Sequence, residues 1–119
     1  NNIGAHAPDN SNLQPAFSVP HNCMVAHGGA VKACRAVGIS GEIGTTHNLY
    51  WFGPYTTKPE VVVAAHRTRA YNNEWFIGPA FKGEYPQCMV DWFKGNGVEV
   101  PILPGAMETI AEPIDFIGV

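Results

Sequence analysis

Two short β-type segments separated by helical sequence constrain the fold of this chain more than any other feature. Residues 41–48 are β-rich and bounded by glycines and by the turn-forming Gly53-Pro54, and residues 113–119 form a second strand-like run. Strands joined through helices form right-handed crossovers in a parallel sheet. Parallel sheets are covered on both faces, so two such strands do not make a sheet that stands alone. The sequence therefore predicts an incomplete α/β structure.

The first helix is predicted from Ser18 to Ala36. Small and apolar residues recur there at helical spacing, with Pro20 near the start and Gly38 just past the end. Residues 1–16 are rich in Gly, Pro, Asp and Asn and show no sustained period, so we expect a long surface loop before this helix.

A second helix is expected to begin at Thr57-Lys58-Pro59-Glu60, which has the residue types of a capping box. We expect it to run to about Phe76 and its unit to be closed by Pro79 and Gly83. Two further helical pieces are expected after it, at residues 86–95 and 106–110.

Composition and charge exclude several classes of partner. The net charge is -3 with seven Lys and Arg, which provides no basic face, so we expect no nucleic-acid partner. The longest apolar run, Val61 to Ala65, is far shorter than the ~20 residues of a membrane-spanning helix, so we expect no membrane partner. Cys23, Cys34 and Cys88 show no C-x-x-C spacing, which favours free, mostly buried thiols and a reducing, cytoplasmic compartment.

A metal site was the main chemical alternative, since Cys23, His27 and Cys34 fall on one face of the first helix. Seven residues of helix span about 10 Å, whereas all ligands of one zinc ion lie about 2 Å from it. These residues cannot share a metal without outside ligands, and Gly28-Gly29 lacks the context of a phosphate-binding loop. We expect neither a metal nor a cofactor.

Five short phrases stand in a fixed order along the chain: His6-Ala7-Pro8; His21-Asn22 with Ala26-His27; Gly41-Glu42-Ile43-Gly44, then Asn48 and Trp51-Phe52-Gly53-Pro54; Trp75-Phe76 with Pro79 and Gly83-Glu84-Tyr85-Pro86; and Asp115-Phe116-Ile117-Gly118. Their order and spacing resemble those of family 1 glycoside hydrolases, the β-glucosidase-type enzymes. Asp9 and Gly53 depart from the family pattern, which usually has Gly and an acid at these positions, and this puts the local loop shape in doubt.

The resemblance implies a (β/α)8 TIM barrel, of which this chain supplies about a quarter, from the loop after strand four into strand six. Residues 1–119 would then be a single segment of the catalytic barrel, incomplete at both ends, with the remainder of the barrel polypeptide as its partner. The resemblance places the acid/base glutamate in a T-x-N-E-P phrase before Asn1 and the nucleophile in an E-N-G phrase beyond Val119. We therefore expect the isolated chain to be inactive.

The acids of the chain support the same expectation. A retaining glycosidase needs two carboxyl groups ~5 Å apart, and a barrel enzyme carries them at the carboxyl ends of its strands. Glu42 and Asp115 are predicted at strand beginnings, and the other acids lie in helical stretches or loops: Asp9, Glu60, Glu74, Glu84, Asp91, Glu99, Glu108 and Glu112. No catalytic residue is expected among them.

Substrate contacts are expected at the carboxyl end of the first strand. Asn48 shares a face with Gly44, so its amide would bond sugar hydroxyls if that face points into the barrel; the alternative is a loop-capping Asn. Trp51 could stack on a sugar or its leaving group, although such residues are more often core. His47 is expected to be a hydrogen-bonded packing residue against the helices. His6 is expected to be a solvated loop residue, with the pocket rim as the alternative.

The function implied is that of a fragment of a retaining β-glucosidase, which hydrolyses terminal β-D-glucosyl residues of a β-glucoside substrate. Two alternatives stay open: a fragment of a 6-phospho-β-glycosidase, and a noncatalytic structural or interaction module derived from the barrel.

Overall fold

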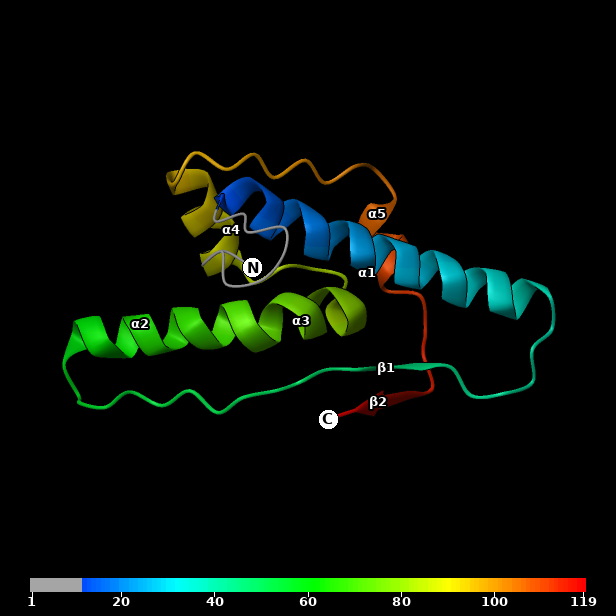
Figure 1. The fold of residues 1–119 in the computed structure, drawn as a ribbon, viewed down its shortest axis with the longest axis horizontal. Coiled ribbons are helices and arrows are strands. Elements are labelled where there is room, and N and C mark those ends of the chain that lie inside the picture. The colour runs from blue at the N-terminus through cyan, green and yellow to red at the C-terminus, as the bar shows by residue number, and fades with distance from the viewer. Residues whose placement is uncertain (1–11) are drawn as a thin grey trace.

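The computed structural model describes residues 12–119. Along the chain the elements are α1 (Leu13–Ala36), β1 (Gly44–Thr46), α2 (Pro59–Arg69), the π-helical turn η1 (Ala70–Glu74), α3 (Trp75–Lys82), α4 (Gln87–Gly95), α5 (Ala106–Ile110) and β2 (Phe116–Gly118). The helices lie on one side of the paired strands (Figure 1). The predicted alternation of strands and helices is confirmed.

The two strands pair in parallel, as the sequence predicts, with Gly44 opposite Phe116 and Thr46 opposite Gly118. The pairing extends beyond both strands, because the N–H of His47 donates to the carbonyl of Gly118 at 2.9 Å and the N–H of Asp115 donates to that of Ile43 at 2.7 Å. A side chain at position 44 would place its Cβ 2.4 Å from the carbonyl oxygen of Phe116, so only glycine fits there. Within residues 12–119 the sheet has these two strands only.

Helix α1 begins at Leu13, so the predicted start at Ser18 is wrong. The side chain of Asn12 accepts a hydrogen bond from the N–H of Gln14 at 2.8 Å and caps the helix. Pro15 fits in the first turn because an N–H there has no helical partner to lose. Turn-forming residues that predicted a loop therefore start a helix. The rest of the predicted loop, residues 1–11, lies outside the described residues.

The second helical unit also extends beyond its predicted end. Helix α2 begins at Pro59 with Lys58 as its N-cap and without a side-chain cap, so the predicted capping box does not form. Helix then continues through η1 and α3 to Lys82, and Gly83 ends it in the left-handed conformation at φ 67°. Pro79 lies inside α3 and not at its end. Burial of the proline ring offsets the backbone hydrogen bond that its missing N–H would have made.

An aromatic cluster forms the larger core. Phe17 of α1, Trp75 of α3 and Phe93 of α4 are 0%, 1% and 0% exposed. The ring centroid of Trp75 lies 5.6 Å from that of Phe17 and 5.2 Å from that of Phe93. Tyr85 completes the cluster, with its ring centroid 4.3 Å from that of Trp75. The first helix, α1, is thereby held against α3 and α4, which follow it far along the chain.

The chain is elongated and leaves much apolar surface bare. Its radius of gyration is 15.9 Å, whereas a compact domain of this length has a radius of about 13.5 Å. Large apolar side chains stand in solvent, including Val37 at 78% and Leu103 at 70% exposure. Both features agree with the predicted incomplete α/β structure. No helix among the described residues combines the length and apolar character needed to cross a membrane.

The three cysteines are free, but the expectation that they are mostly buried is wrong: Cys23 and Cys88 are exposed and Cys34 is half-buried. Met24 and Met89 follow two of them in sequence and occupy the core positions instead. Adjacent helical residues point in different directions, so each methionine is buried while the neighbouring thiol faces solvent.

Helices α1 and α5 approach each other most closely at Gly28. A Cβ at this position would lie 1.8 Å from the backbone oxygen of Thr109. We predict that Gly28→Ala lowers the free energy of unfolding by roughly 2 kcal/mol or more, because α5 must shift. The neighbouring Gly29 has no atom within 4 Å of its added Cβ and serves as the matched control. Gly29→Ala should raise stability by about 0.5–1 kcal/mol. Urea unfolding of the complete polypeptide measures both changes in stability. Equal effects of the two substitutions would contradict the close-approach explanation.

Candidate functional site

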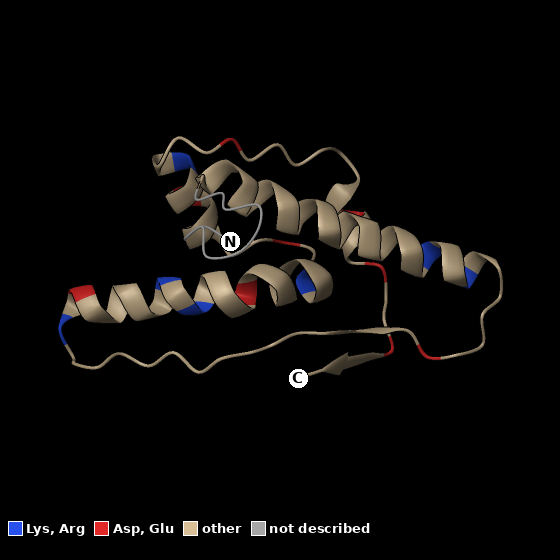
Figure 2. Cartoon of the chain, in the orientation of Figure 1, with Lys and Arg blue, Asp and Glu red and all other residues tan. Residues whose placement is uncertain are grey.

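The predicted substrate residues lie on the β1–α2 segment, residues 47–58, which leaves the carboxyl end of β1 and leads to α2. The segment contains no Lys, Arg, Asp or Glu before Lys58. Figure 2 shows this as an uncharged stretch that ends in one basic residue just before α2. Amide, hydroxyl and aromatic groups are the chemistry that the segment offers to a ligand.

Asn48 and Trp51 both stand in solvent on this segment. Asn48 is exposed, and its amide Nδ2 donates a hydrogen bond to the hydroxyl of Tyr50 at 2.5 Å. Trp51 is 90% exposed. A Cβ at Gly53 would lie 3.1 Å from the indole nitrogen of Trp51, so this glycine leaves room for the indole beside the backbone. Both predicted side chains thus follow the carboxyl end of β1, and neither is buried by the part of the chain that the structure describes.

One residue that holds this segment was not found from the sequence. The side chain of Asn73, in η1, accepts a hydrogen bond from the N–H of Tyr50 at 3.2 Å and donates one to its carbonyl at 2.7 Å. Asparagine is a poor former of helix interiors. Two consecutive ones, Asn72 and Asn73, within a helical pattern are the signal that would have drawn attention to this place.

His47 packs against the helices, as predicted, with its ring centroid 5.9 Å from that of Phe76. The predicted hydrogen bond is not made by its Nε2, which is buried and has no partner among the described residues, and the same is true of His27 Nε2. Burial, and then the nearby His27, lower the pKa of His47 below its usual value.

The two acids nearest the sheet lie at its amino end, as the sequence predicts. Glu42 and Asp115 precede β1 and β2. The Asp115 carboxylate accepts a hydrogen bond from the N–H of Ile43 at 2.7 Å and forms an ion pair with Arg35 of α1. That backbone N–H, followed by the Arg35 guanidinium, holds the pKa of the Asp115 carboxyl below its usual range. This arrangement ties α1 to both strands, and the absence of a catalytic acid from the chain stays a prediction.

Cys23, His27 and Cys34, the residues considered for a metal site, all lie on α1. Over residues 12–119 there is no place where three or more His, Cys, Asp or Glu side chains could hold an ion together. His6 and the phrase His6-Ala7-Pro8 lie outside the described residues, as does Asp9.

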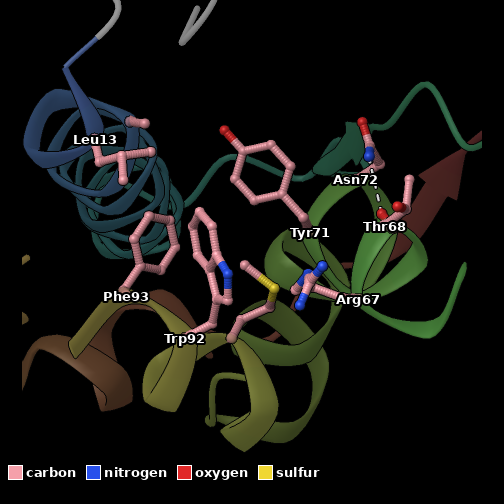
Figure 3. A pocket seen from close by; sticks show the side chains of 9 residues that line it. Leu13, Arg67, Thr68, Tyr71, Asn72, Trp92 and Phe93 are labelled. Atoms are coloured by element: carbon pink, nitrogen blue, oxygen red, sulfur yellow. Dashed lines mark hydrogen bonds between the residues drawn. The ribbon is translucent and has the colours of Figure 1, made fainter. Parts of the chain in front are cut away.

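A pocket of about 160 Å³ opens between α1, the α2–η1 helix and α4 (Figure 3). Tyr71 and Trp92 are on its wall, and Arg67 lies 6.0 Å from the centroid of the Trp92 ring system. Its volume is below the ~300 Å³ at which ligand pockets begin. None of its lining residues belongs to the β1–α2 segment, so this pocket is a packing gap between helices and is separate from the candidate site.

Comparison with known proteins identifies the kind of enzyme that shares this fold and these phrases. The solved structure of a β-glucosidase from Exiguobacterium marinum superposes on the chain with a TM-score of 0.90 at 34% identity, covering 97% of this chain and 27% of its own. β-Glucosidase A of Acetivibrio thermocellus is 34% identical over 116 residues, which make up 98% of this chain and 26% of that protein. A 6-phospho-β-galactosidase of Clostridium acetobutylicum is 33% identical over 105 residues, 82% of this chain and 22% of that protein.

These likenesses define the chain as part of a (β/α)8 barrel of the glycosidase type. The family model for glycosyl hydrolase family 1 matches residues 2–119, and the chain belongs to this family. It spans about a quarter of the length of the relatives described above. The resemblance seen in the sequence phrases is confirmed.

The lowered pKa of His47 leads to a prediction about pH. A buried base whose folded pKa lies below its unfolded value takes up a proton on unfolding, so stability falls as the pH drops through the unfolded value of about 6.5. We expect His47→Leu to weaken this loss of stability between pH 7.5 and pH 5, with a remainder from His21, whose pKa is also lowered by burial. Urea unfolding of the complete polypeptide at pH 7.5 and pH 5 measures this loss of stability.

The exposed His66 of α2 provides the control for this experiment. His66→Leu should leave the difference in stability between the two pH values as it is in the natural protein. An unchanged difference in the His47→Leu variant would show that His47 does not contribute to acid sensitivity.

Proposed function

We propose that this chain is a segment of a retaining β-glucosidase that hydrolyses the O-glycosidic bond of terminal β-D-glucosyl residues. Its membership of glycosyl hydrolase family 1 supports the reaction class. The names of relatives such as β-glucosidase A of Acetivibrio thermocellus support the substrate class. The observation that carries the proposal is the pair Asn48 and Trp51, exposed at the carboxyl end of β1, because that end of a barrel strand is where active sites lie.

The two side chains have different tasks in this proposal. The Asn48 amide has a donor and an acceptor that can bond neighbouring sugar hydroxyls. Such bonds contribute to catalysis where they strengthen as the sugar ring distorts toward the transition state. Trp51 presents an aromatic face on which the leaving group can stack. The proton transfer and nucleophilic attack belong to two glutamates outside these 119 residues.

The similarity to a 6-phospho-β-galactosidase supports a second candidate, a 6-phospho-β-glycosidase. The unphosphorylated sugar is the first candidate because the names of relatives such as β-glucosidase A of Acetivibrio thermocellus refer to it. The deciding assay compares turnover of an aryl β-glucoside with that of its 6-phosphate by the complete polypeptide. A higher kcat/KM for the unphosphorylated substrate is expected, and the reverse order would establish the second candidate.

Substitutions test the two proposed contacts. In the complete polypeptide, Asn48→Ala and Trp51→Ala should each lower kcat/KM on an aryl β-glucoside by about fivefold, since each contact contributes about 1 kcal/mol. Tyr55, on the same segment and 97% exposed, is the control, and Tyr55→Ala should have little effect. If kcat/KM stays unchanged in both site variants, this edge of β1 does not bind the substrate.

The isolated chain of 119 residues is predicted to be inactive. It should also associate with itself, because its strand edges and apolar helix surfaces are bare. An aryl β-glucoside assay and analytical ultracentrifugation of the purified chain measure both properties. Clear turnover would contradict the proposed location of the glutamates, and a stable monomer with two-state unfolding would favour the noncatalytic module.

A further inference from the structure

The contact between Asn73 and Tyr50 joins two parts of the chain that are 23 residues apart. The side-chain amide of Asn73 meets both polar groups of the Tyr50 backbone: its Oδ1 lies 3.2 Å from the Tyr50 nitrogen and its Nδ2 lies 2.7 Å from the Tyr50 oxygen. An asparagine amide has one acceptor and two donors, so it can pair with a peptide unit as a neighbouring strand would. Asn73 therefore acts as a short substitute for the strand partner that the chain lacks after β1.

Within residues 12–119, no other hydrogen bond from another element reaches the middle of the β1–α2 segment. The ladder of the sheet ends where the N–H of His47 donates to Gly118, and the helical bonds resume at the carbonyl of Lys58. Among the described residues, Asn73 is the only one from another element that hydrogen-bonds the backbone between residues 48 and 57. Asn48 lies two residues before Tyr50 and Trp51 lies one residue after it, so the backbone at both positions depends on this anchor.

The π-helical turn aims Asn73 at the segment. Tyr71 and Trp75 are four residues apart, with Asn73 midway between them. Trp75 belongs to the aromatic cluster and Tyr71 packs against it. Residues two apart in a helix do not share a face, so Asn73 points away from that core. Its neighbour Asn72 has a different partner and donates to the carbonyl of Thr68 at 2.8 Å within its own helix. The two adjacent asparagines thus have separable roles.

We propose that Asn73 is a positioning residue for the glycosidase site: it fixes the β1–α2 segment through the Tyr50 backbone and so orients Asn48 and Trp51 toward the sugar. This proposal rests on the function proposed above. Asn73 itself does not contact the substrate. Without its two bonds the segment samples more conformations, and binding must then order Asn48 and Trp51 at the cost of substrate affinity and rate.

The first measurement is hydrogen–deuterium exchange of the peptide covering residues 47–58 in the complete polypeptide. Asn73→Ala removes both bonds and should speed exchange of this peptide, including the Tyr50 amide. Asn73→Leu keeps the size of the side chain, is a better helix former and should have the same effect, which guards against a general loss of folding. Asn72→Ala is the matched control and should leave the exchange of this peptide as it is. Unchanged exchange in both Asn73 variants would overturn the proposal.

The second measurement is a mutant cycle in kcat/KM on an aryl β-glucoside. Asn73→Ala alone should lower kcat/KM by about tenfold with the melting temperature close to that of the natural protein. In a background that already carries Asn48→Ala and Trp51→Ala, the same change should cost less than about twofold, because the groups that Asn73 positions are gone. An equal cost in both backgrounds would overturn the positioning role. If Asn48→Ala and Trp51→Ala alone have no effect on kcat/KM, the proposed substrate contacts fail, while the exchange measurement still decides whether Asn73 anchors the segment.

Discussion

Burial of Trp75 is the constraint on which the rest of this structure depends. Its ring contacts Phe17 of α1, Phe93 of α4 and Tyr85 before α4, and it is 1% exposed. Each large aromatic side chain removed from water contributes about 2–3 kcal/mol to stability, and ring–ring contacts add to this. Phe17 and Phe93 also contact each other, so the three rings join α1, α3 and α4, and Trp75 is the member that sets the rotation of the α2–η1–α3 helix about its axis.

The candidate site follows from that fixed rotation. Once Trp75 and Tyr71 face the aromatic cluster, Asn73 between them faces the opposite side, where the chain runs back from β1 toward α2 (Figure 1). Its amide then meets the Tyr50 backbone at 2.7 and 3.2 Å. A core contact thus reaches the surface residues Asn48 and Trp51 through a single hydrogen-bonded side chain. The π-helical turn belongs to this connection, since its carboxyl end is the residue directly before Trp75.

The parts of the fold that sequence patterns predicted are those set by local chemistry. The two strands and their parallel pairing were predicted from glycine boundaries and helical crossovers, and the structure has them, although regular strand covers only Gly44–Thr46 and Phe116–Gly118 of the predicted 41–48 and 113–119. The start of α1 was missed because Asn12 and Pro15 serve equally well in a turn and in a first helical turn. The pair Asn72-Asn73 marks the place of the η1 turn in the sequence, but the partner of Asn73 depends on packing across the chain, which the local pattern does not record. The exposure of Cys23 and Cys88 was missed for the same reason, since the methionines beside them compete for the core.

The two ends of the sheet differ in the chemistry of the side chains that they carry. At the amino end, the Asp115 carboxylate accepts the Ile43 N–H and pairs with Arg35, so charge is used there to join α1 to both strands. At the carboxyl end, the chain from β1 to α2 carries no charge before Lys58 and exposes an amide and an indole. Barrel enzymes separate their ends in this way, with stability below and chemistry above. An ion pair suits the amino end because its partners are fixed, whereas the uncharged segment at the carboxyl end offers amide and aromatic groups instead of charges.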